Sequence, residues 1–174
     1  MADERDGIDK VADIIKDIRT CMLTTVSDDG RLLSRPMAVQ QVRFGGDLWF
    51  VADGGSGKIG HIRHSTQVNV AFVDGDTWVS LAGTAEVIHD DAKAEELWNS
   101  NLDTWFPRGP RTPGLVLIKV QADTAEYWDA SFANPVGAVS SLIKLATGRA
   151  KGRRPDIAEN ETVQLGTDTS SSDR

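Results

Sequence analysis

The residues best suited to chemistry in this sequence lie in a glycine-rich loop, Gly55-Ser56-Gly57-Lys58, that follows an apolar segment and opens a short helical pattern. Glycines let the backbone approach a ligand closely, and the first amides of a helix point outward at the positive end of its dipole. Ser56 adds a hydroxyl group and Lys58 a positive charge. These features suit a pocket for one phosphate monoester. The loop alone leaves open the alternative of a tight strand-to-helix turn with a solvated lysine.

The same loop also matches the dinucleotide-binding pattern G-x-G-x-x-G over residues 55–60, with Asp74 placed 19 residues after Gly55 as a candidate ribose-binding acid. A Rossmann unit needs a full crossover helix and a parallel second strand, and only residues 58–66 precede the next strand pattern. We therefore set this reading aside, and NAD binding remains an outside alternative. The Walker A pattern fails as well, because Ala52 stands at its first glycine and Ile59 at its Ser or Thr.

Two further groups could bind a ligand. Arg35 lies in a predicted strand beside Pro36, which cannot donate to a sheet ladder, and a guanidinium placed there can hold a phosphate through paired hydrogen bonds. An exposed strand charge is the alternative for Arg35. Trp105 lies in a proline-punctuated loop outside any periodic pattern, where its ring could cover a flat ligand.

The sequence does not contain the residue patterns of a metal site, a serine nucleophile or an internal disulfide. His61 and His64 lie three positions apart, His89 is remote, and no carboxylate or cysteine spacing completes a metal site. No G-x-S-x-G nucleophile motif occurs. Cys21, the single cysteine, excludes an internal disulfide and lies in an apolar run, so we expect it to fill the core.

The bulk composition narrows the class of protein. A chain of 174 residues fits one domain with a modest tail, and a net charge of −7 argues against nucleic acid as a partner. Residues 1–10 are charged and no apolar run is long enough to cross a bilayer, so we expect a cytoplasmic protein without membrane contact. Five basic and no acidic residues fall within 136–155, which suits a solvated helix or contact with a partner or an anion.

The elements that position these groups follow from periodicity and turn residues. Helices are predicted at 6–19, 58–64, 91–100 and 136–146. Strands are predicted at 20–26, 32–41, 48–52, 68–73, 77–88 and from 115 to 120 or on to 128. The first three strands are expected to form an antiparallel meander, and the polar chain from about 148 an extended or disordered tail. The predicted fold class is mainly β (α+β), a six-stranded antiparallel barrel with flanking helices.

Several segments, in this order, carry a resemblance to a known family. They are Ser34-Arg35-Pro36-Met37, Leu48-Trp49-Phe50-Val51, Ser56-Gly57-Lys58, the run 78–86, Leu97-Trp98, the run 105–110 and Ala125-Glu126-Tyr127-Trp128. With them the chain resembles the pyridoxamine 5′-phosphate oxidase-like, FMN-binding split-barrel superfamily, and within it the bacterial general stress protein branch. The resemblance implies an FMN-binding split-barrel domain over 1–147 and a polar C-terminal tail over 148–174.

The resemblance also implies a homodimer with FMN in the groove between two protomers. By matching position, Arg35, Ser56 and Lys58 would hold the flavin phosphate. The residues that would face the ribityl chain and the ring are Pro36, Met37, Ala38, Phe50, Val51, Ala52, Ser80 and Trp105.

Two departures bear on function. The true oxidases often carry a basic residue beside the phosphate lysine, where this chain has Gly57, and their C-terminal substrate-binding segment is not found after Trp128. We therefore expect an FMN-binding general stress protein that can pass electrons to an unknown acceptor, rather than a pyridoxamine phosphate oxidase, and we assign no catalytic residue. An F420-dependent reductase on the same barrel and a non-enzymatic flavin-binding protein are the alternatives.

Overall fold

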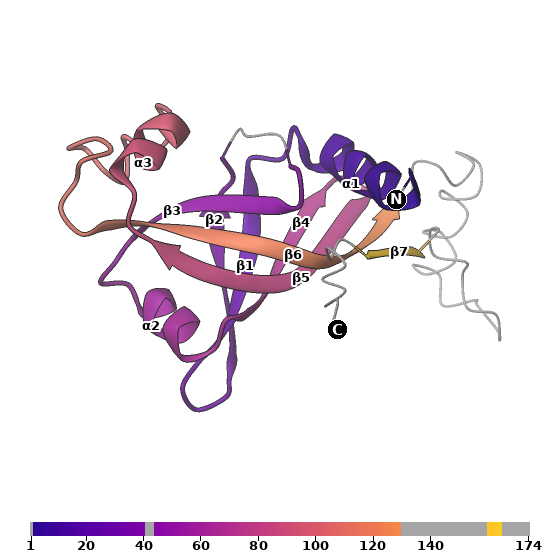
Figure 1. The fold of residues 1–174 in the computed structure, drawn as a ribbon, viewed down its shortest axis with the longest axis horizontal. Coiled ribbons are helices and arrows are strands. Elements are labelled where there is room, and N and C mark those ends of the chain that lie inside the picture. Colours follow the sequence, from indigo (N-terminus) through magenta and orange to yellow (C-terminus); the bar gives the residue numbers. More distant parts are fainter. Residues whose placement is uncertain (1, 41–43, 130–159, 165–174) are drawn as a thin grey trace, which may run out of the picture.

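A computed structural model describes residues 2–40, 44–129 and 160–164 of the chain, and these form a curled antiparallel sheet with helices at its ends (Figure 1). The helices are α1 (Ala2–Ile15), α2 (Gly57–His64) and α3 (Asp91–Leu97). The strands are β1 (Thr20–Val26), β2 (Leu32–Ala38), β3 (Asp47–Asp53), β4 (Gln67–Asp74), β5 (Thr77–Ile88), β6 (Leu115–Asp129) and β7 (Asn160–Gln164). Figure 1 shows α1 at one end of the sheet and α2 and α3 at the other.

Six strands follow the order β2-β1-β4-β5-β6-β3, and every pair is antiparallel. The sheet curls into a half-barrel, so that β2 and β3 at its two ends approach each other without pairing. The long pair β5–β6 runs from Thr77↔Asp129 to Ile88↔Leu117 and shifts register at Ala82/Gly83. The predicted fold class, a mainly β six-stranded antiparallel split barrel with flanking helices, is confirmed.

The predicted meander is wrong in its third strand. β2 pairs with β1, but β3 pairs with β6 at the far end of the sheet. The reason lies in the side chains of β3, which are apolar on both faces. Phe50 lies fully buried in the main core, while Val51 packs against Leu117 and α3 in a second cluster. A strand that needs cover on both faces is better placed beside β6 than exposed next to β2.

A seventh strand lies in the segment predicted to be a polar tail. Residues Asn160–Gln164 pair antiparallel with β6, from Trp128↔Asn160 to Thr124↔Gln164. Their composition is polar, and edge pairing uses backbone groups that a polar sequence supplies as well as an apolar one. The predicted helix at 136–146 and the basic residues of 136–155 lie outside the described residues.

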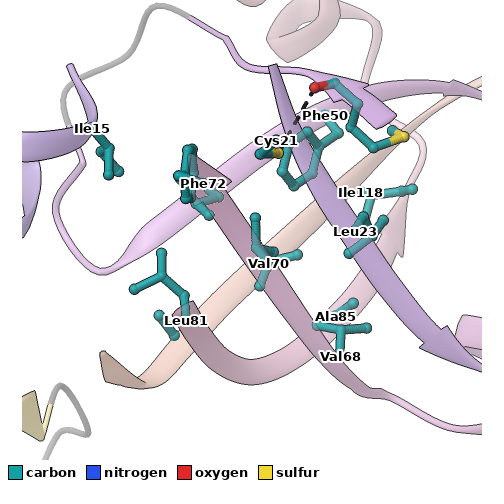
Figure 2. Packing of buried hydrophobic residues seen from close by; sticks show 14 of the residues in the cluster. Ile15, Cys21, Leu23, Phe50, Val68, Val70, Phe72, Leu81, Ala85 and Ile118 are labelled. Carbon is teal, nitrogen blue, oxygen red and sulfur yellow. Dashed lines mark hydrogen bonds between the residues drawn. The ribbon is translucent and has the colours of Figure 1, made fainter. Parts of the chain in front are cut away.

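The main core fills the concave side of the sheet. Side chains alternate along β1 and β4, so that Cys21 and Leu23 point inward beside Val70 and Phe72 (Figure 2). Cys21 is 2% exposed, its Sγ donates to the Met37 carbonyl oxygen at 3.8 Å, and burial raises its pKa to about 12. Its predicted structural role is confirmed. No helix within the described part of the chain is long and apolar enough to cross a membrane.

One glycine is required by the close approach of two strands. A Cβ atom on Gly83 would lie 2.0 Å from the Gln121 carbonyl oxygen, at the point where the β5–β6 register shifts. Only glycine lets β5 bend against β6 there, and such irregularities increase the coiling of a sheet. The curl that brings β2 towards β3 therefore depends in part on Gly83.

Candidate functional site

A cavity of about 640 Å³ opens where the ends of β2 and β3 meet the start of α2 and the loop between α3 and β6. The end of β3, α2 and this loop lie at one end of the sheet in Figure 1. Predicted site residues that line the cavity are Pro36, Met37, Ala38, Val51, Ala52, Lys58 and Trp105. Segments far apart in the sequence thus contribute to one hollow of the size that ligand pockets usually have.

The two predicted phosphate-binding cations influence each other electrostatically. Burial is the main cause that lowers the pKa of Lys58, the positive charge of Arg35 lowers it further, and Asp53 acts in the opposite direction. Burial also lowers the pKa of Arg35. Neither side chain forms an ion pair with any residue of the described segments. Two partly buried cations that form no ion pair within the described segments make a site that an anion would stabilise.

Arg35 is held by a short polar chain inside the barrel. Its Nη1 donates to Thr25 Oγ1 at 2.7 Å and, more weakly, to the Leu23 carbonyl oxygen at 3.4 Å. Thr25 Oγ1, which is fully buried, shares a further hydrogen bond of 3.0 Å with His61 Nδ1 on α2. Sequence analysis missed Thr25 and His61 in this role. The signal for Thr25 was its inward register on β1, where the other inward residues are apolar.

The glycine-rich loop is organised by Asp53. Its carbonyl oxygen accepts from Ser56 N at 3.0 Å and from Ser56 Oγ at 2.7 Å, while its Oδ1 accepts from Gly55 N at 2.9 Å. Ser56 is the N-cap residue of α2, yet its hydroxyl makes no cap hydrogen bond and does not line the cavity. The first turn of α2 carries Lys58 and no acidic residue, so the ammonium adds to the positive end of the helix dipole.

Four predicted site residues do not line the cavity of the single chain. Arg35 points into the barrel beside it, and Ser56 is turned towards Asp53. Phe50 is a core residue with no exposed surface, so only its backbone can face a ligand. Ser80 lies on the outer face of the sheet, where its Oγ accepts from Asn69 Nδ2 at 2.8 Å.

The loop after α3 presents an aromatic and a basic side chain to the cavity. Leu102 is 2% exposed and Phe106 packs edge-to-face on Trp98 with ring centroids 6.2 Å apart, so both anchor the loop. Trp105, between these anchors, is 74% exposed and lines the cavity. Arg108 also lines it and was missed by sequence analysis, which treated the surrounding run only as a family segment.

A second hollow of about 520 Å³ lies between α2 and the strands β5 and β6. None of the predicted site residues lines it. Its Lys119 is already paired with Asp47 at 3.0 Å and lies over the Trp49 ring. The cavity that contains Lys58 is therefore the stronger candidate, because it is lined by predicted site residues and its lysine has no ion-pair partner among the described residues.

The outer face of the sheet exposes large apolar side chains. Met22 on β1, Val73 on β4 and Trp78 on β5 are 40%, 58% and 39% exposed, and Leu32 on β2 is 73% exposed. Met22 pairs with Ala71, and Val73 with Trp78, so these side chains extend across neighbouring strands. Exposed apolar side chains spread over neighbouring strands are a feature of interaction surfaces.

Comparison with known proteins gives consistent matches. Residues 6–156 match a family described as pyridoxamine 5′-phosphate oxidase like. The chain is 33% identical over 154 residues to Protein bli-3 of Neurospora crassa, covering 80% of this chain and 73% of that protein. The structure of General Stress Protein 26 from Bacillus anthracis superposes with a TM-score of 0.61 at 30% identity, over 68% of this chain and 91% of that one. The general stress FMN/FAD binding protein of Xanthomonas citri gives 0.60 at 29% identity, over 70% and 87%.

Proposed function

We propose that this chain, which belongs to the pyridoxamine 5′-phosphate oxidase-like family, binds FMN in the cavity between β2, β3 and α2. The general stress proteins to which the chain is similar include one whose name states that it binds FMN or FAD. The proposal places the flavin phosphate at Arg35 and Lys58 and the ring nearer Trp105.

The observation that carries the proposal is a pair of partly buried cations, Lys58 lining the cavity and Arg35 beside it, which have no ion-pair partner among the described residues. A phosphate monoester carries a charge between about −1.5 and −2 at neutral pH, which matches two cations. Asp53 faces the same cavity, so the site would disfavour a ligand with many more negative groups. FMN, with its one phosphate, matches the two cations, and titration against F420 tests this choice.

Other residues of the site also suit a bound FMN. A flavin supplies the redox chemistry of such a protein, while the polypeptide supplies binding, orientation and electrostatics. Thr25 would orient the guanidinium of Arg35 towards the phosphate through their 2.7 Å hydrogen bond. Trp105 would shield one face or edge of the ring from water, since its side chain is exposed at the mouth of the cavity.

We further propose that two protomers associate through the outer face of the sheet, with the flavin at their interface. The exposed Met22, Val73 and Trp78 lie on this face and would be buried by a second copy. Ser80 lies among the same strands, so the partner arrangement would be what brings it to a flavin.

Titration of the purified full-length protein with FMN, F420 and NAD tests the cofactor assignment. We expect FMN to bind tightest, at one per protomer, with a visible flavin spectrum after gel filtration. Tighter binding of F420 or NAD, or no binding of FMN, would contradict it. Light scattering would give the mass of a dimer, and a monomer carrying bound FMN would remove the interface proposal while keeping the cofactor. Turnover with reduced nicotinamide and a dye acceptor separates an oxidoreductase from a protein that only holds flavin.

A further inference from the structure

Arg108 is an exposed cation that lines the cavity and has no partner among the described residues. Its side chain lines the cavity, and it makes no ion pair or hydrogen bond with any residue that the structure describes. The nearby Arg111 is different, because its Nε donates to Glu95 Oε1 at 2.8 Å. Of these two arginines on one loop, Arg111 is paired, whereas Arg108 has no partner in the part of the chain that the structure describes.

The loop holds Arg108 in a defined position. The turn 106–109 has Pro107 at its second place and is closed by a hydrogen bond of 2.9 Å from Gly109 N to the Phe106 carbonyl oxygen. Gly109 has a φ of +77°, a conformation that favours glycine. Thr112 then donates through both its N and its Oγ1 to the Gly109 carbonyl oxygen, at 3.1 and 2.7 Å. A preorganised loop loses little entropy when its arginine binds a ligand.

Arg108 reaches the cavity from the loop between α3 and β6, whereas Lys58 lies in the first turn of α2 and Arg35 lies on β2. A phosphate dianion at Arg35 and Lys58 would leave the guanidinium of Arg108 uncompensated. The cavity therefore has a second anion-binding group that a single flavin phosphate does not use.

The chemistry of this second group favours one kind of ligand. A lone guanidinium matches a carboxylate, because its planar fork can donate two parallel hydrogen bonds to one carboxylate and neutralise its single charge. Trp105, three residues earlier on the same loop, offers an exposed ring that contacts flat molecules well. We propose that Arg108 binds the carboxylate of a planar organic acid, the second ligand of the FMN-loaded protein, while the acid's ring lies against the part of the Trp105 ring that the flavin leaves exposed.

This inference rests on the proposed function, so FMN loading of the full-length protein is measured first. Benzoate and benzamide, which share a ring and differ in charge, are then titrated into the loaded protein by equilibrium dialysis. We expect benzoate to bind at least tenfold more tightly than benzamide. Arg108→Gln should abolish this preference and leave the affinity for FMN unchanged, whereas Arg111→Gln on the same loop should keep it.

The outcomes separate the two proposals. If the wild-type protein does not load with FMN, the proposed function fails and this inference fails with it. If the protein loads normally but shows no preference for benzoate, or keeps the preference in Arg108→Gln, only the inference is overturned. Phenyl phosphate that binds through Arg108 more tightly than benzoate would overturn the carboxylate assignment.

Discussion

Replacing Lys58 by methionine separates the binding role of the ammonium from its effect on stability. Methionine is unbranched and one atom shorter than lysine, has a similar helix propensity and carries no charge. Lys58 lies in the first turn of α2, which carries no acidic residue, and its pKa is lowered mainly by burial and then by Arg35. Each of these features is unfavourable for a cation in the ligand-free protein. We therefore expect Lys58→Met to lower FMN affinity without lowering the stability of the apoprotein.

Lys58→Met should change two quantities, the Kd for FMN and the stability of the apoprotein. Loss of one charge-assisted contact to phosphate costs about 1.5–3 kcal/mol, which is roughly a 10- to 150-fold rise in the Kd for FMN. Riboflavin lacks the phosphate and should change by less than about twofold. Removing a cation from a helix N-terminus should stabilise the apoprotein by about 0.3–1 kcal/mol.

The dependence on pH has a defined sign. The folded-state pKa of Lys58 lies below its unfolded value, so the unfolded chain binds more protons between the two and stability rises with pH in that window. A bound phosphate would raise the pKa of Lys58 again, so FMN affinity should fall as the pH rises through the lowered pKa. Both trends should disappear in Lys58→Met.

The assay is flavin fluorescence titration with FMN and riboflavin at fixed ionic strength, together with thermal unfolding of the apoprotein. Equal weakening of both flavins would show that Lys58 does not contact a phosphate. A loss of more than about 1 kcal/mol in apoprotein stability would show that the lysine is structural, contrary to its position.

Three other predictions concern residues of different kinds. Trp105→Leu should reduce the quenching of tryptophan fluorescence by FMN and leave the melting temperature unchanged, because the side chain is 74% exposed; unchanged quenching would place this residue away from the ring. Gly83→Ala should destabilise the protein by about 3 kcal/mol in denaturant unfolding, since its Cβ would lie 2.0 Å from a backbone oxygen, whereas Gly60→Ala, with nothing within 4 Å, should be neutral or slightly stabilising. Cys21, with its pKa raised to about 12, should resist a disulfide reagent at pH 8 in the native protein and react at once after unfolding; rapid labelling of the folded chain would contradict its burial.

Local sequence signals were sufficient for most of the elements. Thr20–Val26 and Thr77–Ile88 match the predicted strands residue for residue, because β-branched runs end at turn residues such as Asp29-Gly30 and Asp74-Gly75. Which strands pair with each other could not be predicted from local sequence. The position of β3 depends on which neighbours can cover its two apolar faces, and the pairing of β7 depends on a free edge of β6. Neither property can be predicted from the residues of the strand alone.

The candidate site divides in the same way. Residue type and loop chemistry marked Arg35, Lys58 and Trp105, and the fold brings all three to one end of the sheet. The residues that position or accompany them were hidden, because a threonine in an apolar strand and a histidine on a short helix have no distinguishing spacing. Thr25 acquires its role only when the β1–β2 register places it diagonally to Arg35.

The features of the site that are unfavourable for the stability of the apoprotein are the same features that would favour binding of an anion. Folding alone would favour an acidic residue in the first turn of α2 and a neutral one at Arg35, since both cations lose hydration on burial and repel each other. The chain instead adds Thr25 and His61 to hold the guanidinium in place. Such an arrangement suits an anion bound beside both cations, as the proposed phosphate site requires. Double substitution of Arg35 and Lys58 by neutral residues should then give an apoprotein at least as stable as the wild type that no longer distinguishes FMN from riboflavin. If that protein still preferred FMN, the phosphate would have to bind elsewhere in the cavity.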